Sequence, residues 1–170
     1  IDYLIKGFKI VKDKNPNLHL KLKIAGSGSQ LDNLKELVKE LNLEDSVEFL
    51  GRIPLNEVSN VFNSFDIAVF PSLRESFGVA AVEAQACGIP VIVTSVGGHH
   101  EVVINDKTGI IVESENSRQI SDAILKLLND ENLRKSMSIE GRNFVKENYE
   151  INLNFNAIED IYKEILNIKK

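Results

Sequence analysis

Residues 66–93 hold the pattern that most restricts the fold: a short apolar run, a helix of small residues and a second apolar run. Residues 66–70 (DIAVF) have the character of a strand buried on both faces. Pro71 ends that strand because proline cannot continue a hydrogen-bonded ladder. Residues 78–87 (GVAAVEAQAC) have a helix pattern, and residues 91–93 begin the next strand. Strand, helix and strand in this order predict a parallel pair joined by a crossover helix.

The rest of the chain continues this alternation of strands and helices. Further strands are predicted at residues 19–25, 47–50 and 109–112. Helices are predicted at residues 2–13, 31–41, 56–65, 117–128, 131–148 and 153–168, with Asp130 as a cap between two of them. The pattern predicts an α/β fold with a Rossmann-like parallel sheet and helices on both faces. We divide the chain into a Rossmann-like lobe at residues 1–150 and a C-terminal helix at residues 151–170.

Composition and charge exclude several classes of protein. The 170 residues are 43% hydrophobic and 26% charged, which suits one domain with a full core. A net charge of −5 argues against nucleic acid as a partner, since such proteins carry a basic surface. No apolar run approaches the roughly 20 residues of a membrane span. The single cysteine excludes an internal disulfide and favours a reducing compartment. Because the sequence begins inside a helix pattern without Met, we expect an excised domain.

Two acidic residues flank the predicted start of the helix at residues 78–87. Glu75 lies in the loop at the carboxyl end of a strand, where open α/β sheets bind their ligands. Glu83 lies inside an otherwise apolar helix, and helical side chains lean toward the N-terminus. The helix start itself offers backbone N–H groups and a positive dipole end, which suit an anion. This arrangement fits a nucleotide sugar, with hydroxyls at both ends and phosphates in the middle. The alternative is that both carboxylates pair with a neighbouring Arg or Lys.

These residues also carry a resemblance to a known family. The stretch P-S-x-x-E-x-F-G-x4-E-A-x-A-x-G-x-P-V-I from Pro71 onward, followed by G-G-x-x-E at residues 97–101, resembles the donor-binding half of retaining glycosyltransferases of the GT-B fold, in particular glycosyltransferase family 4. Glu75 and Glu83 match the family's E-x7-E pair. The resemblance covers nearly the whole chain and implies one lobe of a two-lobed enzyme.

The resemblance implies a role for each candidate site residue. Glu75 would face the donor sugar as the catalytic residue, and Glu83 would bind the ribose hydroxyls of the nucleotide. The backbone N–H groups of Phe77, Gly78 and Val79 would bind the diphosphate. At the ends of two other strands, Gly26, Gly28, Arg52 and Ile53 would approach the nucleotide. The resemblance implies no cofactor and no required metal ion.

Simpler interpretations stay open for several of these residues. The turn at Gly26 and Gly28 is also a plain turn between strand and helix, and a dinucleotide fingerprint would need glycine where Leu31 stands. Arg52 is also a solvated surface charge. His99 and His100 are expected to be exposed loop residues.

Glu101 and Cys87 complete the candidate residues. Glu101 either caps a short helix or approaches the donor pocket, and the sequence does not separate the two. Cys87 is expected to be a small buried apolar residue. No Cys and His spacing indicates zinc.

The same resemblance sets expectations for the whole protein. An acceptor-binding lobe and a basic pair that neutralises the diphosphate would lie upstream of Ile1. The full-length protein would be a hexosyltransferase-type enzyme with a glycan, lipid or small-molecule acceptor. It would act in the cytoplasm, with a possible association with the inner face of the membrane. Residues 1–170 alone would be inactive. A nucleotide-sugar epimerase lobe and a non-catalytic nucleotide-sugar-binding module are the alternatives.

Overall fold

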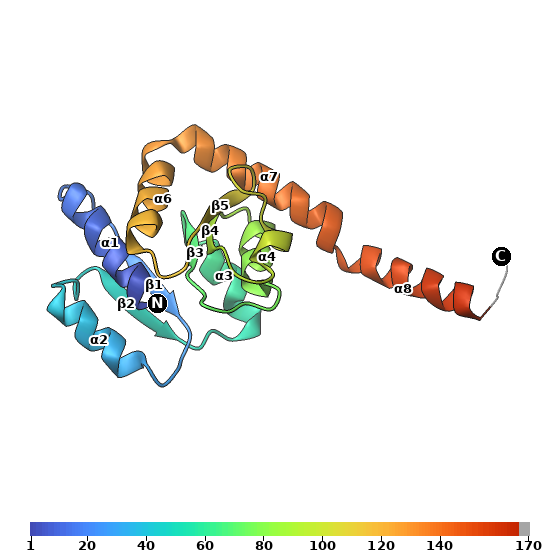
Figure 1. Ribbon diagram of the computed structural model, residues 1–170, viewed down its shortest axis with the longest axis horizontal. Coiled ribbons are helices and arrows are strands. Elements are labelled where there is room, and N and C mark those ends of the chain that lie inside the picture. Colours follow the sequence, from blue (N-terminus) through green and yellow to red (C-terminus); the bar gives the residue numbers. More distant parts are fainter. Residues whose placement is uncertain (167–170) are drawn as a thin grey trace.

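The computed structural model describes residues 1–166 and places helices around five short strands (Figure 1). The strands are β1 Leu22–Ala25, β2 Val47–Gly51, β3 Ala68–Phe70, β4 Val91–Thr94 and β5 Gly109–Val112. The helices are α1 Asp2–Lys14, α2 Leu31–Glu40, the 3-10 turn η1 Leu55–Glu57, α3 Val58–Phe62, α4 Val79–Ala86, α5 His99–Val102, α6 Ser117–Asn129, α7 Glu131–Tyr149 and α8 Ile151–Ile165.

Every strand pair is parallel, as the alternation predicts. β1 pairs with β2, and β4 lies between β3 and β5, with Ala68 opposite Val91 and Val91 opposite Gly109. The single sheet expected from the sequence is instead two sheets, because within residues 1–166 no ladder bond joins β1 to β3. The prediction of a parallel α/β fold with flanking helices is nevertheless confirmed.

Helix α1 holds the two sheets together. Its residues Leu4 and Val11 belong to a core cluster with β4, β5 and α6, whereas Ile5 and Phe8 pack with β1 and α2. A glycine lets α1 approach α6 closely, since a Cβ on Gly7 would lie 2.9 Å from the Ser117 carbonyl oxygen. Burial of these apolar side chains, each contributing roughly 1.5–3 kcal/mol, stabilises the arrangement without hydrogen bonds between the sheets.

Several boundaries differ from the sequence-based prediction. The strand expected at residues 19–25 begins only at Leu22. The helix expected at residues 56–65 is η1 followed by α3, which stops at Phe62 because the next backbone N–H groups form turn hydrogen bonds. Of β3 only Ala68 is buried, so the strand buried on both faces is β4.

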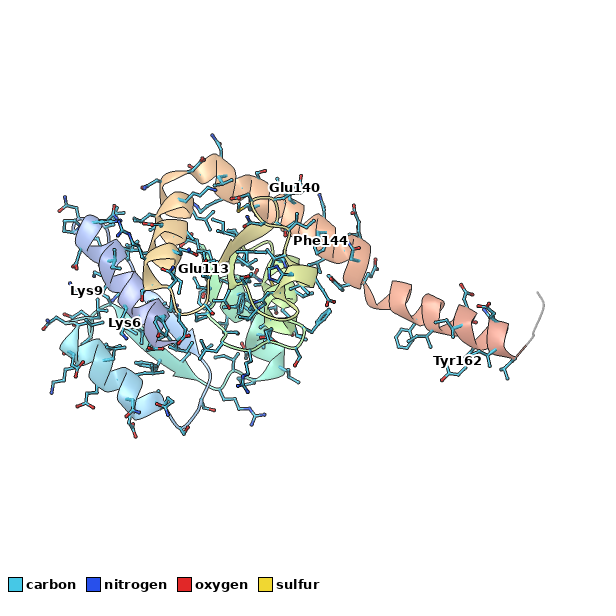
Figure 2. All side chains as sticks on the ribbon, viewed as in Figure 1. Lys6, Lys9, Glu113, Glu140, Phe144 and Tyr162 are labelled. Carbon is cyan, nitrogen blue, oxygen red and sulfur yellow. The ribbon has the colours of Figure 1, made fainter. Side chains whose placement is uncertain are left out.

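Of the two C-terminal helices, α7 packs on the core through Met137 and α8 leads away from it. Asp130 caps α7, as predicted, by accepting a hydrogen bond from the Leu133 backbone N–H at 2.9 Å. Helix α8 then extends beyond the rest of the fold, and Figure 2 shows Tyr162 far from the sheets. Its large side chains Phe155, Ile158, Ile161 and Ile165 are each more than half exposed. The helix was expected at residues 153–168, and Ile168 lies outside the described residues. In residues 1–166 no helix has the length and apolar character of a membrane span.

Candidate functional site

The loop between β3 and α4 carries Glu75, and a threonine on the neighbouring strand fixes where the loop begins. The buried Thr94 hydroxyl, at the end of β4, donates to the carbonyl oxygen of Ser72 at 2.7 Å and lies 3.4 Å from that of Phe70. Because β3 and β4 are parallel, both strands end at the same edge of the sheet. Glu75 therefore lies at the carboxyl edge, as the sequence predicts.

The Glu75 carboxylate is partly buried and held by its own loop. Its side chain is 30% exposed. The backbone N–H of Ser76 donates to Oε1 at 3.1 Å, and the Ser72 hydroxyl donates to Oε2 at 3.4 Å. The Nε2 atom of His99 lies 3.9 Å from Oε2, within ion-pair distance when the ring is protonated and beyond a hydrogen bond. One side chain and one backbone group thus orient a carboxylate that solvent still reaches.

Two glycines after β4 allow the next loop to pack directly against this one. An added Cβ at Gly97 would lie 1.7 Å from the Glu75 carbonyl oxygen, and one at Gly98 would lie 2.4 Å from the Phe77 Cα. The Gly98 N–H donates to the Glu75 carbonyl oxygen at 3.2 Å. The contact explains why the sequence has two successive glycines here.

The start of α4 presents donors without acceptors. Gly78 caps the helix with a φ of +99°, and its carbonyl oxygen accepts from the N–H groups of Ala81 and Val82. Within residues 1–166 the N–H groups of Phe77, Gly78 and Val79 donate no hydrogen bond. Phe77 and Val79 are 37% and 58% exposed, so this helix end is open to solvent. Unsatisfied N–H groups at a positive dipole end are suited to an anion.

Glu83 lies on the exposed face of α4. Buried Ala81, Ala84 and Gln85 form the opposite face of the helix. The Glu83 carboxylate therefore points to solvent, although its neighbours in sequence are apolar. In the part of the chain that the structure describes, the Glu83 carboxylate forms no hydrogen bond or ion pair. This lack of a partner argues against the interpretation that it pairs with a neighbouring Arg or Lys.

The residues predicted at the other strands follow the two strands of the two-stranded sheet, β1 and β2. The Gly26 N–H donates to the Gly51 carbonyl oxygen at 2.7 Å, which brings the end of β1 next to the end of β2 and to Arg52. Gly26, Gly28 and Arg52 are exposed, and Ile53 is partly buried. No hydrogen bond or ion pair in residues 1–166 joins this group to the loop of Glu75. The structure therefore brings together Glu75, Phe77, Gly78 and Val79 around the start of α4, and it places Gly26 and Gly28 next to Arg52 and Ile53 at the ends of β1 and β2.

His99 was expected to be exposed, and this expectation is wrong. Its side chain is 1% exposed, and Nδ1 lies 2.8 Å from the Thr94 carbonyl oxygen. The cause is its place in α5, since His99, Val102 and Val103 share the face that packs on the core. That spacing of three and four residues was the signal available in the sequence. His100 is exposed, as expected, with Nε2 3.1 Å from the Ser95 hydroxyl.

Tyr149, at the end of α7, is a further residue beside the site that the sequence did not reveal. Its hydroxyl donates to the Glu101 carbonyl oxygen at 2.8 Å, and its ring meets that of Phe77 edge to face with centroids 5.5 Å apart. Burial, followed by the Glu101 charge, raises the pKa of Tyr149. The hydroxyl therefore stays a donor at neutral pH. Glu101 takes part in this contact through its backbone carbonyl oxygen, and its side chain forms no cap at the start of α5.

Cys87, at the end of α4, is partly buried rather than fully buried. Burial is the main cause of a raised pKa of its thiol. The expectation of a buried residue is therefore met only in part.

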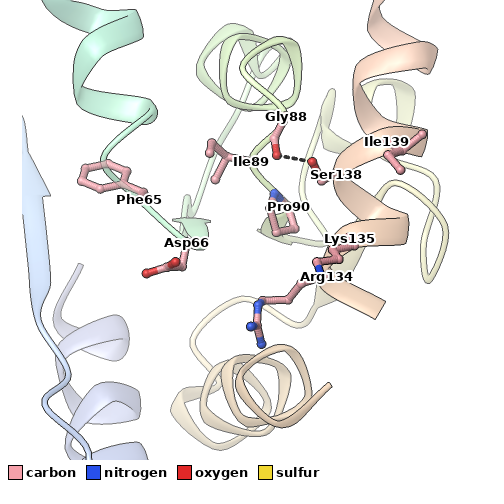
Figure 3. A pocket seen from close by; sticks show the side chains of 9 residues that line it. All are labelled: Phe65, Asp66, Gly88, Ile89, Pro90, Arg134, Lys135, Ser138 and Ile139. Carbon is pink, nitrogen blue, oxygen red and sulfur yellow. Dashed lines mark hydrogen bonds between the residues drawn. The ribbon is translucent and has the colours of Figure 1, made fainter. Parts of the chain in front are cut away.

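A hollow at the opposite end of the three-stranded sheet has a structural explanation. Figure 3 shows it between the residues that precede β3 and β4 and the first turns of α7. Its Arg134 guanidinium donates to the carbonyl oxygens of Leu127 and Leu128, and the Ser138 hydroxyl donates to that of Gly88. These polar groups cap helices, so their place in the hollow has a structural explanation. In residues 1–166 no cluster of three or more His, Cys, Asp or Glu could hold a metal ion.

Comparison with known proteins identifies the family. The model of the glycosyl transferases group 1 family matches residues 1–144, so this chain belongs to that family. The chain superposes with a TM-score of 0.79 and 31% identity on the C-terminal domain of the glycosyl transferase group 1 family protein LpcC from Francisella tularensis, covering 88% of this chain and 79% of that one. Its sheets and flanking helices therefore have the Rossmann-like architecture of a GT-B glycosyltransferase C-terminal domain.

Two longer relatives are named by their activity or bound molecules. The D-inositol 3-phosphate glycosyltransferase of Pseudarthrobacter chlorophenolicus is 35% identical over 136 residues, which are 79% of this chain and 32% of that protein. A mutant of S. aureus TarM in complex with fondaparinux, alpha-GlcNAc-glycerol and UDP is 25% identical with a TM-score of 0.80, covering 98% of this chain and 32% of that one. The chain spans between 32% and 43% of the length of the first curated relatives it matches.

Proposed function

We propose that this chain is the donor-binding lobe of a retaining, hexosyltransferase-type glycosyltransferase of glycosyltransferase family 4. The observation that carries the proposal is the fixed Glu75 carboxylate beside a helix end whose N–H groups have no acceptor. A nucleotide sugar joins a hydroxyl-rich sugar to a diphosphate, and the two features match these two parts. The relative crystallised with UDP supports the choice of ligand.

Each residue then receives a distinct part of the donor. The Glu75 carboxylate accepts hydrogen bonds from hydroxyls of the sugar, and the N–H groups of Phe77, Gly78 and Val79 bind the diphosphate. Glu83 accepts from the ribose hydroxyls, and a charge-assisted hydrogen bond of this kind contributes roughly 1.5–3 kcal/mol. Gly26, Gly28, Arg52 and Ile53 border the base end of the nucleotide.

The remaining parts of the reaction require a longer protein. We propose that the leaving diphosphate is stabilised without a metal ion, by the helix end and by basic residues outside this chain. A helix end supplies only about half a unit of charge, so residues 1–170 alone bind nucleotide weakly and transfer no sugar. The acceptor binds to a second lobe, and α8, with its apolar side chains exposed, packs toward that lobe. The full-length protein acts in the cytoplasm, at the inner face of the membrane when its acceptor is a lipid.

Variants of the full-length protein test the proposal. Saturation-transfer NMR with a panel of nucleotide sugars identifies the donor, and calorimetry then measures its affinity. Glu83→Gln should weaken binding of both the nucleotide sugar and the bare nucleoside diphosphate, because both contain ribose. Glu75→Ala should lower turnover strongly and leave the affinity for the nucleoside diphosphate nearly unchanged, because that product lacks the sugar.

Glu36→Gln is the matched control, because Glu36 is an exposed glutamate on α2. Unchanged nucleotide affinity in Glu83→Gln would contradict the ribose assignment. If Glu75→Ala lost affinity for the nucleotide sugar and for the nucleoside diphosphate equally, Glu75 would not contact the sugar. Turnover measured with and without acceptors distinguishes transfer from epimerisation, and binding without turnover would indicate a non-catalytic module.

A further inference from the structure

His99 lies directly behind the candidate catalytic carboxylate, and one of its ring nitrogens has a fixed role. Nδ1 is 2.8 Å from the Thr94 carbonyl oxygen, and the side chain is 1% exposed. A carbonyl oxygen only accepts hydrogen bonds, so Nδ1 carries the hydrogen. The hydrogen bond therefore fixes the direction of Nε2, which carries a hydrogen of its own only in the protonated ring.

The second ring nitrogen points to Glu75. Nε2 lies 3.9 Å from Oε2, and in residues 1–166 Glu75 is the only acidic side chain within ion-pair distance of the ring. The Cδ2 atom beside it lies 3.0 Å from the place a Cβ on Gly78 would take, so the ring fills the space between α5 and the helix cap. The absence of a Cβ at Gly78 thus leaves room for the imidazole.

We propose that His99 is a positioning residue for Glu75, acting through Nε2; this inference rests on the proposed function. In the protonated ring both nitrogens carry a hydrogen, and the positive charge at Nε2 draws Oε2 toward α5. The other oxygen, Oε1, which the Ser76 N–H binds, then takes a fixed direction toward the donor sugar. His99 touches no substrate and acts only through the carboxylate.

Two substitutions separate this role from a purely structural one. An asparagine at position 99 places its amide N–H where Nδ1 stands, so His99→Asn keeps the donor to Thr94 and loses the group facing Glu75. A glutamine reaches the place of Nε2, so His99→Gln keeps a donor toward Glu75 and loses the one to Thr94. His100→Asn, on the exposed neighbour, is the control.

The experiment measures kcat and the donor KM of the full-length enzyme, with thermal melts to establish folding. We expect His99→Asn to lose about 10- to 100-fold in kcat with little change in KM, the size of effect that a misplaced reacting group produces. We expect His99→Gln to stay close to wild type. An active His99→Asn, or equal losses in both variants, would overturn the proposal and assign His99 to packing.

A second measurement is independent of turnover and of any variant of His99. The imidazole nitrogens of His99 and His100 are followed by 15N NMR in the wild type and in Glu75→Gln. Removing the Glu75 charge should shift the Nε2 resonance of His99 and leave that of His100 in place; an unmoved His99 resonance would overturn the inference. Loss of turnover in Glu75→Ala without effect in His99→Asn would refute the inference and leave the proposed function standing. Retained turnover in Glu75→Ala would refute the proposed function itself.

Discussion

Two glycine turns follow strands of this protein, and they contain glycine for different reasons. At Gly26 and Gly28, after β1, an added Cβ would meet nothing within 4 Å. At Gly97 and Gly98, after β4, it would meet the backbone of the loop that carries Glu75 at 1.7 and 2.4 Å. The first turn is open and the second is closed by a neighbouring loop. Similar composition therefore gives an open turn in one place and close packing of the backbone in the other.

The largest effect is expected from Gly97→Ala. The methyl group would overlap the Glu75 carbonyl oxygen, which is backbone and moves only with its loop. Overpacking of this kind typically costs roughly 1–3 kcal/mol of stability, and we expect the upper end here because the contact is with backbone. Urea denaturation measures the cost, and affinity for the proposed donor should fall with it. Stability equal to wild type would show that the two loops do not touch in solution.

Gly26→Ala should have an intermediate effect, because it tests conformation without crowding. Gly26 has a φ of +126°, which residues with a Cβ rarely adopt, and no neighbour would block the new methyl group. The strain costs roughly 1–2 kcal/mol, again measured by urea denaturation. A loss as large as that of Gly97→Ala would erase the distinction between the two turns.

Tyr149→Phe tests the support behind the closed turn. The lost hydrogen bond to the Glu101 carbonyl oxygen should cost about 0.5–1.5 kcal/mol at neutral pH. Burial raises the pKa of Tyr149 in the folded protein. The hydroxyl therefore contributes its full share to the free energy of unfolding below the ordinary tyrosine pKa of about 10, and this share is lost as pH rises through the folded-state pKa. Unfolding curves of both proteins should therefore converge at alkaline pH, whereas a constant difference would mean that the hydroxyl does not matter.

Gly28→Ala should have the smallest effect on stability. Gly28 has an ordinary φ and open surroundings, so we expect unfolding within about 0.5 kcal/mol of wild type. If the turn borders the nucleotide, the same variant should nevertheless bind nucleotide less tightly. Calorimetry beside the urea measurement separates the two effects, and unchanged affinity would place the ligand away from this turn.

The sequence was most informative where structure depends on neighbours along the chain. Strand, loop and helix around Glu75 follow from local periodicity, and the cap at Asp130 follows from side-chain chemistry. The division into two sheets was not predictable in this way, because strand pairing is decided by residues far apart in sequence. The same holds for Tyr149, which reaches Phe77 from another helix. His99 is an intermediate case, since its spacing to Val102 indicated burial whereas its chemistry suggested exposure.

The Thr94 hydroxyl, bound to the carbonyl oxygen of Ser72 and close to that of Phe70, has a consequence for the thermodynamics of binding. A free loop loses backbone entropy worth roughly 1–2 kcal/mol per residue when a ligand orders it. Here the loop is already ordered at its start by Thr94 and at Glu75 by Gly98, so this entropy is lost on folding. Binding energy that would otherwise order the loop remains available for affinity. Thr94→Val would transfer part of that entropic cost to the binding step, as a more negative entropy of association.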